Sequence, residues 1–392
     1  MAEALISRRG GGYAKINFDN YTFSNATIIK PNSTPSSLSE GRCLLAATTV
    51  GDYALFGGGY SSSHTYSTVD AYNSSLTRST PTSLIQDRYE LAATTVGDYA
   101  LFGGGISYPS YSTVDAYNSS LIRSTPSSLS QGRYYLSATT VGDYALFGGG
   151  YSSSSSSTVD AYNSSLTRST PSSLSQSRYH LAATTVGDYA LFGGGSISSS
   201  TVDAYNSSLT RSTPTSLSEG RRELAATTVG DYALFGGGNT ASSTSASDSS
   251  STVDAYSSRL TKITPSSLSQ SRYELAATTV GDYALFGGGF STYSTVDAYN
   301  GNLTRHTSPS LSRSRGRLVA TTVGDYALFG GGYDKSSEVD AFFIGTEIQL
   351  FKGSSYKINS MIDELKITED MEKIAIPSPA TGYIKVKNVT LS

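Results

Sequence analysis

The sequence predicts an all-β fold: a seven-bladed β-propeller of four-stranded blades with a small β appendage at its C-terminal end. Two recurring strings carry this prediction. GDYALFGGG begins at Gly51, Gly97, Gly142, Gly187, Gly230, Gly281 and Gly324. VDAY begins at Val69, Val114, Val159, Val202, Val253 and Val296, and VDAF begins at Val339. Successive copies of the first string start 43–51 residues apart, a spacing typical of propeller blades and too long for a rung of a β-solenoid.

Each repeat contains four candidate strands. The first, LAATTV at 45–50, has the small and β-branched residues of a crowded strand near the axis. It meets the second, YALFGGG at 53–59, across Gly51-Asp52, a pair that suits a two-residue type II′ hairpin. The third strand is STVDAY at 67–72, in which Val and Ala alternate with polar residues and Tyr. The fourth is LTRSTP at 76–81, whose proline is tolerated on an outer edge.

Two further recurring residues predict how the blades hold together. The Phe of each LFGGG string is expected in the core between blades: Phe56, Phe102, Phe147, Phe192, Phe235, Phe286 and Phe329. An Arg precedes each first strand: Arg42, Arg88, Arg133, Arg178, Arg221, Arg272 and Arg315. We expect each Arg to pair with a carboxylate or carbonyl groups of a neighbouring blade, because its planar head serves several acceptors.

The position of one further string predicts how the ring closes. TPxSL begins at Thr34, Thr80, Thr125, Thr170, Thr213 and Thr264, and a shifted TSPSL begins at Thr307. The first copy precedes the first GDYALFGGG, and none follows the last. Residues 25–36 should therefore supply the outer strand of the last blade, which removes a free sheet edge.

The same strings set the expected domain boundaries. These are an N-terminal extension at 1–24, the propeller at 25–342, and a β appendage at 343–392. The appendage lacks the repeat strings and contains strand-like segments at 347–353, 372–377 and 382–388. We expect it to pack with residues 1–24.

These motifs resemble the kelch repeat, a family of propeller blades. The shared features are the glycines of LFGGG, the Tyr of VDAY and the Pro-to-Arg segment TPSSLSQSR, over about residues 30–342. The chain has no Trp, so the Trp of the family pattern is absent and this is a divergent set. The termini, MAEALISRRGGG and IPSPATGYIKVKN, resemble segments of bacteriophage and prophage tail-region proteins. That resemblance implies association with a virion and contacts with other tail subunits through the termini.

Composition excludes several classes of function. The net charge of -3 gives no basic footprint for nucleic acid. No stretch approaches the roughly 20 apolar residues of a membrane span, so we expect no membrane insertion. The single cysteine, Cys43, excludes an intrachain disulfide. The first residues, MAEALISRRGGGYAK, lack the apolar segment of a secretory signal peptide, which indicates cytoplasmic synthesis.

The candidate chemical motifs are better explained by structure, so we expect no enzyme, no metal and no cofactor. His64, His180 and His306 fall in different blades and do not supply the ligands of a copper-radical oxidase. The repeated Asp of GDY occupies a turn, and the repeated Asp of VDAY should satisfy buried amides or the recurring Arg. The GGG triplets lack the helix start and Lys-Ser/Thr of a phosphate loop. The Asn-Ser-Ser triplets are read as turns.

The seven copies differ in two short zones. One lies between GGG and TVDAY; the other is the pair of residues after the recurring Arg, from Cys43-Leu44 to Gly316-Arg317. Because the strands are antiparallel, both zones should emerge on one face, and the constant GD and NSS turns on the other. The varied face is rich in Tyr and Ser, which adaptable binding surfaces use. The predicted ligand-binding residues are Tyr60, Tyr89, Glu90, Tyr134, Tyr135, Tyr151, Tyr179, His180, Arg222, Tyr273, Phe290 and Tyr333.

The sequence thus predicts a non-catalytic recognition propeller, carried on a phage or prophage tail, that binds a cell-surface glycan or protein. Two alternatives stay open. One is an intracellular scaffold for protein–protein interactions, a role common among kelch propellers. The other is a glycan-active enzyme, which would need unlike carboxylates converging on one face; among the variable sites, Glu90, Glu223, Glu274 and Asp334 offer them.

Overall fold

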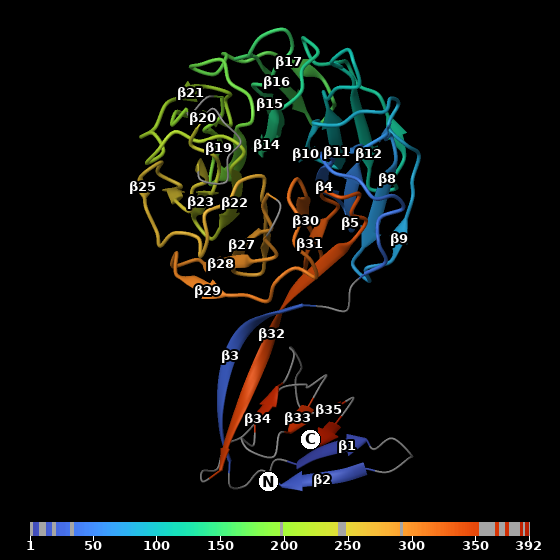
Figure 1. The fold of residues 1–392 in the computed structure, drawn as a ribbon, viewed down its shortest axis with the longest axis vertical. Helices are drawn as coiled ribbons and strands as arrows, with labels where there is room; N and C mark the ends of the chain where they lie inside the picture. Colours follow the sequence, from blue (N-terminus) through green and yellow to red (C-terminus); the bar gives the residue numbers. More distant parts are fainter. Residues whose placement is uncertain are drawn as a thin grey trace. The chain divides into compact units, whose positions relative to one another are not determined.

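The computed structural model describes residues 3–7, 13–17, 21–31, 35–196, 199–241, 248–290, 293–352, 365–367, 373–375, 385–386 and 389–391. Seven sheets form a ring of blades around a central channel (Figure 1). No α-helix occurs among these residues, and none of them forms a helix able to cross a lipid bilayer. The predicted all-β, seven-bladed propeller is confirmed.

The innermost strand of each blade borders the channel. These strands are β4 (Ala46–Val50), β10 (Ala92–Val96), β14 (Ser137–Val141), β18 (Ala182–Val186), β22 (Ala225–Val229), β26 (Ala276–Val280) and β30 (Val319–Val323). Each lies beside its counterparts in the two neighbouring blades, and the ring closes where β30 lies beside β4. Small side chains permit this approach of seven strands around one axis.

The second and third strands pair antiparallel in one register throughout. The second strands are β5 (Tyr53–Gly57), β11 (Tyr99–Gly103), β15 (Tyr144–Gly148), β19 (Tyr189–Gly193), β23 (Tyr232–Gly236), β27 (Tyr283–Gly287) and β31 (Tyr326–Gly330). The third are β8 (Val69–Asn73), β12 (Val114–Asn118), β16 (Val159–Asn163), β20 (Val202–Asn206), β24 (Val253–Ser257), β28 (Val296–Asn300) and β32 (Val339–Lys352). In blade 1, Phe56 lies opposite Asp70. All four residues of VDAY are buried in blade 1, because neighbouring blades cover both faces.

The outermost strands are shorter than expected. They are β9 (Arg78–Ser79), β13 (Arg123–Ser124), β17 (Arg168–Ser169), β21 (Arg211–Ser212), β25 (Lys262–Ile263) and β29 (Arg305–Thr307). The proline that follows each of these short strands cannot donate a further hydrogen bond. In the last blade the outer strand is β3 (Tyr21–Pro31), in the sheet order β3-β32-β31-β30. The ring is closed by an N-terminal strand, as predicted, but the strand covers Tyr21–Pro31 and not the predicted residues 25–36.

The chain divides into two compact units, residues 31–342 and residues 1–30 with 343–392. Within the second unit, β1 (Glu3–Ser7) pairs antiparallel with β2 (Tyr13–Asn17) and parallel with β35 (Lys385–Val386). There β33 (Leu365–Ile367) pairs with β36 (Val389–Leu391), and β34 (Lys373–Ala375) pairs with β32. A hairpin of β6 (Tyr60–Ser61) and β7 (His64–Thr65) rises from blade 1 of the propeller.

Neighbouring blades pack through the recurring Phe. Phe102 of blade 2 is fully buried and joins a core cluster with Val50, Leu55 and Val69 of blade 1. A Cβ atom added to Gly57 would lie 2.7 Å from the ring of Phe102, so only glycine permits this contact. The predicted inter-blade Phe core is confirmed: all seven rings have zero exposure.

The recurring Arg forms a buried ion pair in every blade. Arg42 Nη2 donates to Asp70 Oδ2 at 2.7 Å and to the carbonyl oxygen of Phe56 at 3.1 Å. Asp70 Oδ1 also accepts from the backbone N–H of Ser39 and from Arg78. The other pairs are Arg88–Asp115, Arg133–Asp160, Arg178–Asp203, Arg221–Asp254, Arg272–Asp297 and Arg315–Asp340. The predicted pairing is confirmed, but the prediction of a neighbouring blade was wrong, because each pair lies within one blade.

Candidate functional site

The two variable zones of each repeat lie side by side, as antiparallel strands require. Cys43 and Tyr60 exchange backbone hydrogen bonds of 2.9 and 2.8 Å. Tyr134 and Tyr151 do the same at 2.9 and 2.7 Å. In each case the residue before the innermost strand meets the loop that follows the second strand. The predicted binding residues are therefore brought to one end of the blades.

A closed ring of backbone hydrogen bonds surrounds the channel mouth at this end. It is formed by the second residue of each variable pair: Leu44, Glu90, Tyr135, His180, Glu223, Glu274 and Arg317. Each N–H donates to the carbonyl oxygen at the same position in the preceding blade, over 2.8–3.2 Å, and Leu44 completes the ring with Arg317. All seven have φ of 54–56°, the left-handed region that side chains rarely adopt.

Sequence reasoning missed this ring and part of the site with it. Left-handed backbone is usually signalled by Gly or Asn, and none of these seven residues is either. Leu44, Glu223, Glu274 and Arg317 therefore join the site although they were not among the predicted binding residues. Their equivalence to Glu90 in the repeat was the signal that could have found them.

The side chains of the ring line a cavity of about 500 Å³ at the channel mouth, here called the mouth cavity. Tyr179 and Arg222 contribute to its wall. Its deeper lining consists of aliphatic side chains: Leu45, Leu91, Leu136, Leu181, Leu224, Leu275, Leu318 and Val319. The cavity thus combines a polar and aromatic upper wall with an apolar base.

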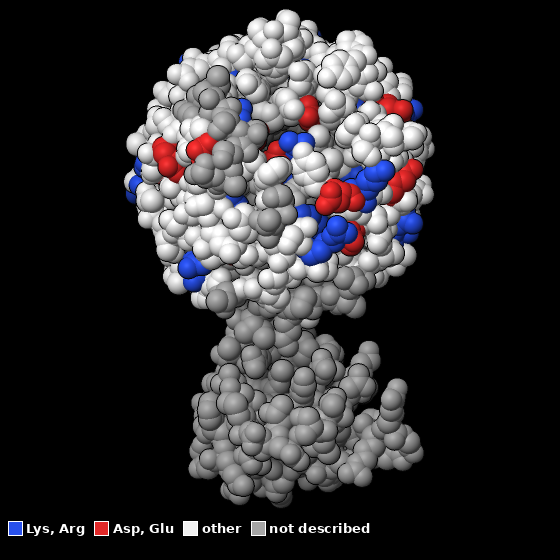
Figure 2. Space-filling view, in the orientation of Figure 1, with Lys and Arg blue, Asp and Glu red and all other residues white. Residues whose placement is uncertain are grey.

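Acidic and basic groups meet within the mouth cavity. Arg317 Nε donates to Glu274 Oε1 at 2.7 Å, and Arg222 Nε lies 3.9 Å from Glu223 Oε1. Glu223 and Glu274 side chains are each only 8% exposed. Charged groups of both signs lie close together on the face seen in Figure 2, most of which is uncharged. The paired signs limit the net charge of the site.

Burial shifts the protonation of several of these groups. It raises the pKa of Glu90 to about 7, although the hydrogen bond with Tyr135 and the charge of Arg317 act in the opposite direction. Burial also raises the pKa values of Glu223 and Glu274. Burial lowers the pKa of His180 to about 3, and the charges of Arg222 and Arg317 add to this effect. The imidazole is therefore neutral near pH 7.

Aromatic rings form clusters around the mouth cavity. Tyr134 contacts Tyr135 and Tyr151, with ring centroids 4.9 and 5.7 Å apart, and Tyr151 contacts Tyr179 at 5.3 Å. Tyr135 lies 3.6 Å from His180 between ring centroids. This cluster unites five of the predicted residues across blades 3 and 4.

Two smaller aromatic groups contain the other predicted rings. Tyr60 and Tyr89 lie 5.1 Å apart between centroids. Tyr273 stacks on Phe290 at 5.1 Å, and Phe290 contacts Tyr333 at 6.0 Å. Most of these rings are half-buried, while Tyr273 is 2% exposed, because neighbouring rings cover one another.

A second cavity, of about 760 Å³, adjoins the first and is here called the side cavity. Its lining comes from blades 1, 2 and 7: Cys43, Leu44, Tyr60, Ser61, Ser62, Tyr89, Glu90, Arg317, Tyr333, Asp334 and Lys335. Leu44, Glu90 and Arg317 line both cavities. The Arg317 guanidinium lies 4.5 Å from the centre of the Tyr333 ring.

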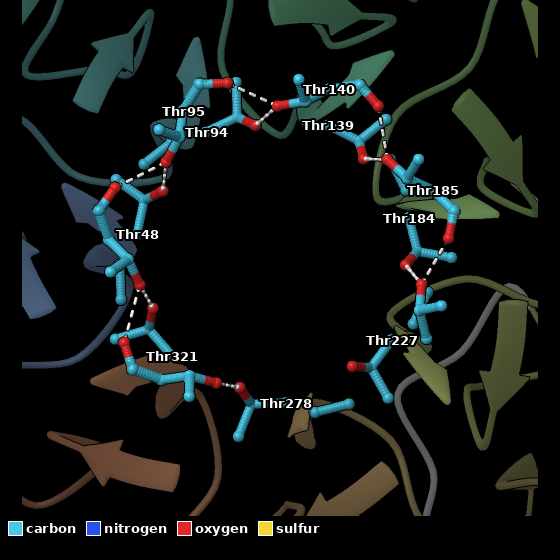
Figure 3. Close-up of a pocket in the computed structure, with 18 of the residues that line it drawn as sticks. Thr48, Thr94, Thr95, Thr139, Thr140, Thr184, Thr185, Thr227, Thr278 and Thr321 are labelled. Atoms are coloured by element: carbon cyan, nitrogen blue, oxygen red, sulfur yellow. Dashed lines mark hydrogen bonds between the residues drawn. The ribbon is translucent and has the colours of Figure 1, made fainter. Parts of the chain in front are cut away.

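Farther along the channel, threonines from all seven blades line the wall (Figure 3). Thr95 Oγ1 donates to the carbonyl oxygen of Thr49 in the preceding blade at 2.6 Å, and lies 2.9 Å from Thr48 Oγ1. Because the Thr95 proton is already donated, Thr48 must be the donor to Thr95. Each blade repeats the link to its neighbour, so the hydroxyl protons are used within the wall.

Among the residues with defined positions, no group of three or more His, Cys, Asp or Glu side chains is placed to hold a metal ion. His64 Nδ1 lies 2.9 Å from Ser63 Oγ in blade 1, and His306 Nε2 lies 3.0 Å from Asn300 Nδ2 in blade 6; neither lines the mouth cavity. The Asn73 side chain accepts backbone N–H bonds from Ser75 and Thr77, which accounts for the recurring NSS turn.

The fold and the site define a class: a β-propeller with an aromatic and charged cavity at one end of its channel. Comparison with known proteins adds the following. No family model matches the sequence, and no curated protein matches it. Among solved structures 688 chains match. One, described as the structure of YjhT, has a TM-score of 0.54 at 11% identity and covers 79% of this chain and 99% of that chain. Identity this low shows the fold alone.

Proposed function

We propose that this chain is a non-catalytic recognition module that binds a cell-surface glycan through its variable face. The observation that carries the proposal is the gathering of the variable aromatic residues at the end of the blades that holds the mouth cavity and the side cavity. Tyr rings stack on the apolar faces of sugars, and their hydroxyls bond to sugar hydroxyls. The carboxylates and guanidinium groups of Glu223, Glu274 and Arg317 add the charged partners that a polyhydroxylated ligand needs.

Drift of exposed loops does not account for the variation. Asp52 and its six copies are exposed on the opposite turns and are identical in all seven repeats. The variable pairs, such as Tyr134-Tyr135 and Arg222-Glu223, are half-buried or buried and yet differ between repeats. Variation at these pairs therefore does not follow exposure, which favours diversification of a binding site over drift.

The sequence supports a location for this module. Its blades resemble divergent kelch repeats, and its termini resemble phage and prophage tail-region segments. In the proposed setting the second unit joins the propeller to other tail subunits, and the variable face meets the host surface. Several copies on one particle would add avidity to a modest single-site affinity.

A binding screen of the purified full chain against immobilised glycans and whole bacterial cells tests the proposal. We expect binding that is lost when Tyr134, Tyr135 and Tyr151 are all replaced by Ser. The control variant carries Ser120→Lys and Ser165→Lys on the exposed constant turns and should bind normally. Binding that survives the triple change but fails in the control would assign the function to the opposite face.

A second candidate, a glycan-active enzyme, is favoured by one observation. Glu90, Glu223 and Glu274 line one cavity, and the pKa of Glu90 is raised to about 7, as in a general acid. Mass spectrometry of bound oligosaccharides after incubation distinguishes the two functions. Cleavage by the wild type that disappears in the Glu90→Gln variant would show that the protein is a glycan-active enzyme. Unaltered oligosaccharides support the binding module.

A further inference from the structure

The mouth cavity and the side cavity adjoin each other. Leu44, Glu90 and Arg317 belong to the lining of both, so the two cavities meet at these residues. The mouth cavity is enclosed by the ring of seven blades, whereas the side cavity lies over blades 1, 2 and 7. A ligand whose end occupies the mouth cavity can therefore extend in one direction, across Glu90 and Arg317.

The mouth cavity contains acceptors without donors. Glu223 Oε2 and Glu274 Oε2 are buried and receive no hydrogen bond from the described residues. Their partner oxygens face Arg222 and Arg317 respectively. A buried carboxylate oxygen without a donor is costly, so such atoms usually mark a place where a ligand or water supplies the bond.

We propose that the two cavities form one two-part site for a neutral oligosaccharide. Its terminal sugar lies in the mouth cavity and donates hydroxyl protons to Glu223 and Glu274. The following sugar lies in the side cavity beside Tyr60, Tyr89 and Tyr333. This inference rests on the proposed glycan-binding function. It adds the two subsites, the direction in which the oligosaccharide runs through them and the side chains that bind each sugar.

Hydroxyl donors fit the mouth cavity better than an ammonium group does. Arg222 and Arg317 place positive charge in the same cavity, and this charge contributes to the low pKa of His180. An ammonium ligand would meet the same repulsion. A hydroxyl can donate to a carboxylate and accept from a neighbouring guanidinium at once, which matches the Arg222–Glu223 and Arg317–Glu274 neighbours in the wall.

The side cavity supplies stacking surfaces. Tyr60 and Tyr89 lie together on its wall, and Tyr333 is held against the Arg317 guanidinium. Its volume of about 760 Å³ exceeds that of the mouth cavity. The second subsite thus relies on ring contacts, and the first on charged hydrogen bonds.

The test uses the full chain and an array of neutral oligosaccharides with defined termini, in which N-acetylglucosamine termini are paired with glucosamine termini. Methyl glycosides of one, two and three sugars of the best-bound oligosaccharide, counted from its terminal sugar, are then titrated by calorimetry. Glu223→Met, which removes the acceptor, should weaken all three lengths by about 10- to 100-fold, and Glu223→Gln by less. Tyr60→Ser should leave the one-sugar glycoside unchanged and remove most of the affinity gained with the second sugar. Asp231→Ser, on the exposed turn of the blade that carries Glu223, is the matched control.

The outcomes separate this inference from the proposed function. If no glycan binds, both fail. If glycans bind but Glu223→Met and Tyr60→Ser keep wild-type affinity at every length, the face binds sugars and the two-part site is wrong. A preference for glucosamine termini over their N-acetylated forms would show that the carboxylates select ammonium, which overturns the assignment of hydroxyl donors.

Discussion

At the scale of single residues, the molecule separates charged groups that hold the blades from charged groups that line the site. The Arg–Asp pairs are buried, and further hydrogen bonds reach the Asp oxygens, whereas the Arg Nε atoms have no partner among the described residues. In the mouth cavity, by contrast, Glu223 and Glu274 retain acceptor oxygens without partners. Residues of the same types thus serve structure in one place and recognition in another.

Removing one member of a buried pair should be strongly destabilising. Replacing Arg133 by Met leaves Asp160 charged and buried, which should lower the free energy of unfolding by about 3–5 kcal/mol. Arg168 bonds the same carboxylate at 2.8 Å from a side chain that is 29% exposed, so Arg168→Met should cost about 1 kcal/mol or less. Urea unfolding of both variants measures the difference. Equal losses would contradict the distinction between the two arginines.

The raised pKa of Glu90 makes stability depend on pH. Its pKa is about 7 in the folded protein and near 4.5 when unfolded, with Tyr135, Arg317 and Glu274 as the charged and titratable groups around it. Between these values the folded state holds a proton that the unfolded state has lost. Stability should therefore fall as the pH rises from about 4.5 to about 7, and then level off.

Glu90→Gln cannot titrate, so its loss of stability across this window should be smaller than that of the wild type. Urea midpoints at pH 5 and pH 8 for both proteins give the comparison. Glu223 and Glu274 titrate in both proteins, so the difference between the two pH responses reports mainly on Glu90. An identical pH response would mean that Glu90 has an ordinary pKa.

At the scale of strands, each blade depends on close approach to the next. The first glycine of every triplet ends the second strand under a Phe ring of the following blade. Gly103, for example, leaves only 2.8 Å between an added Cβ and the Phe147 ring. Glycine is required at this position because any side chain would collide with the Phe ring, and not because of its backbone conformation.

Gly103→Ala should therefore destabilise the fold by about 1–3 kcal/mol, the usual cost of overpacking a core. Gly301→Ala is the matched control, because an added Cβ there meets nothing within 4 Å. Thermal melting should show a clear decrease for the first variant and almost none for the second. A normal melting temperature for Gly103→Ala would show that Phe147 can move aside.

Much of the architecture could be predicted, because seven copies of VDAY and LFGGG reveal the repeat length and the strand order. The ring at the channel mouth could not. Leu44, Glu90 and Arg317 have left-handed backbone imposed by hydrogen bonds between blades, and no local residue preference encodes it. The burial of Tyr273 was also missed, since it depends on Phe290, which lies nearby only in the folded blade.

At the scale of the whole molecule, closure joins the two ends of the chain. The last blade takes its outer strand, β3, from the N-terminal end, next to β32. Neighbouring blades otherwise repeat one interface, so this sheet is the place where the two ends of the repeat array are joined. Such closure protects the sheet edge that a linear array would expose.

Deleting residues 1–36 should therefore leave β32 without its outer neighbour and cause aggregation or loss of cooperative melting. Adding a synthetic peptide of residues 21–36 should restore a single melting transition. Light scattering and calorimetry measure the two effects. A truncated protein that stays monomeric and melts like the parent would show that β3 is dispensable.

The ring of main-chain bonds around the mouth also bears on how such a protein can change. Those bonds hold the backbone in place whichever side chain is attached, and Leu, Glu, Tyr, His and Arg already occupy equivalent positions. The scaffold thus tolerates a wide alphabet at seven sites that face one ligand. Mutations at these seven positions can therefore change ligand specificity without unfolding the propeller. Natural variants, or variants from a directed library, can acquire new ligands on the same backbone.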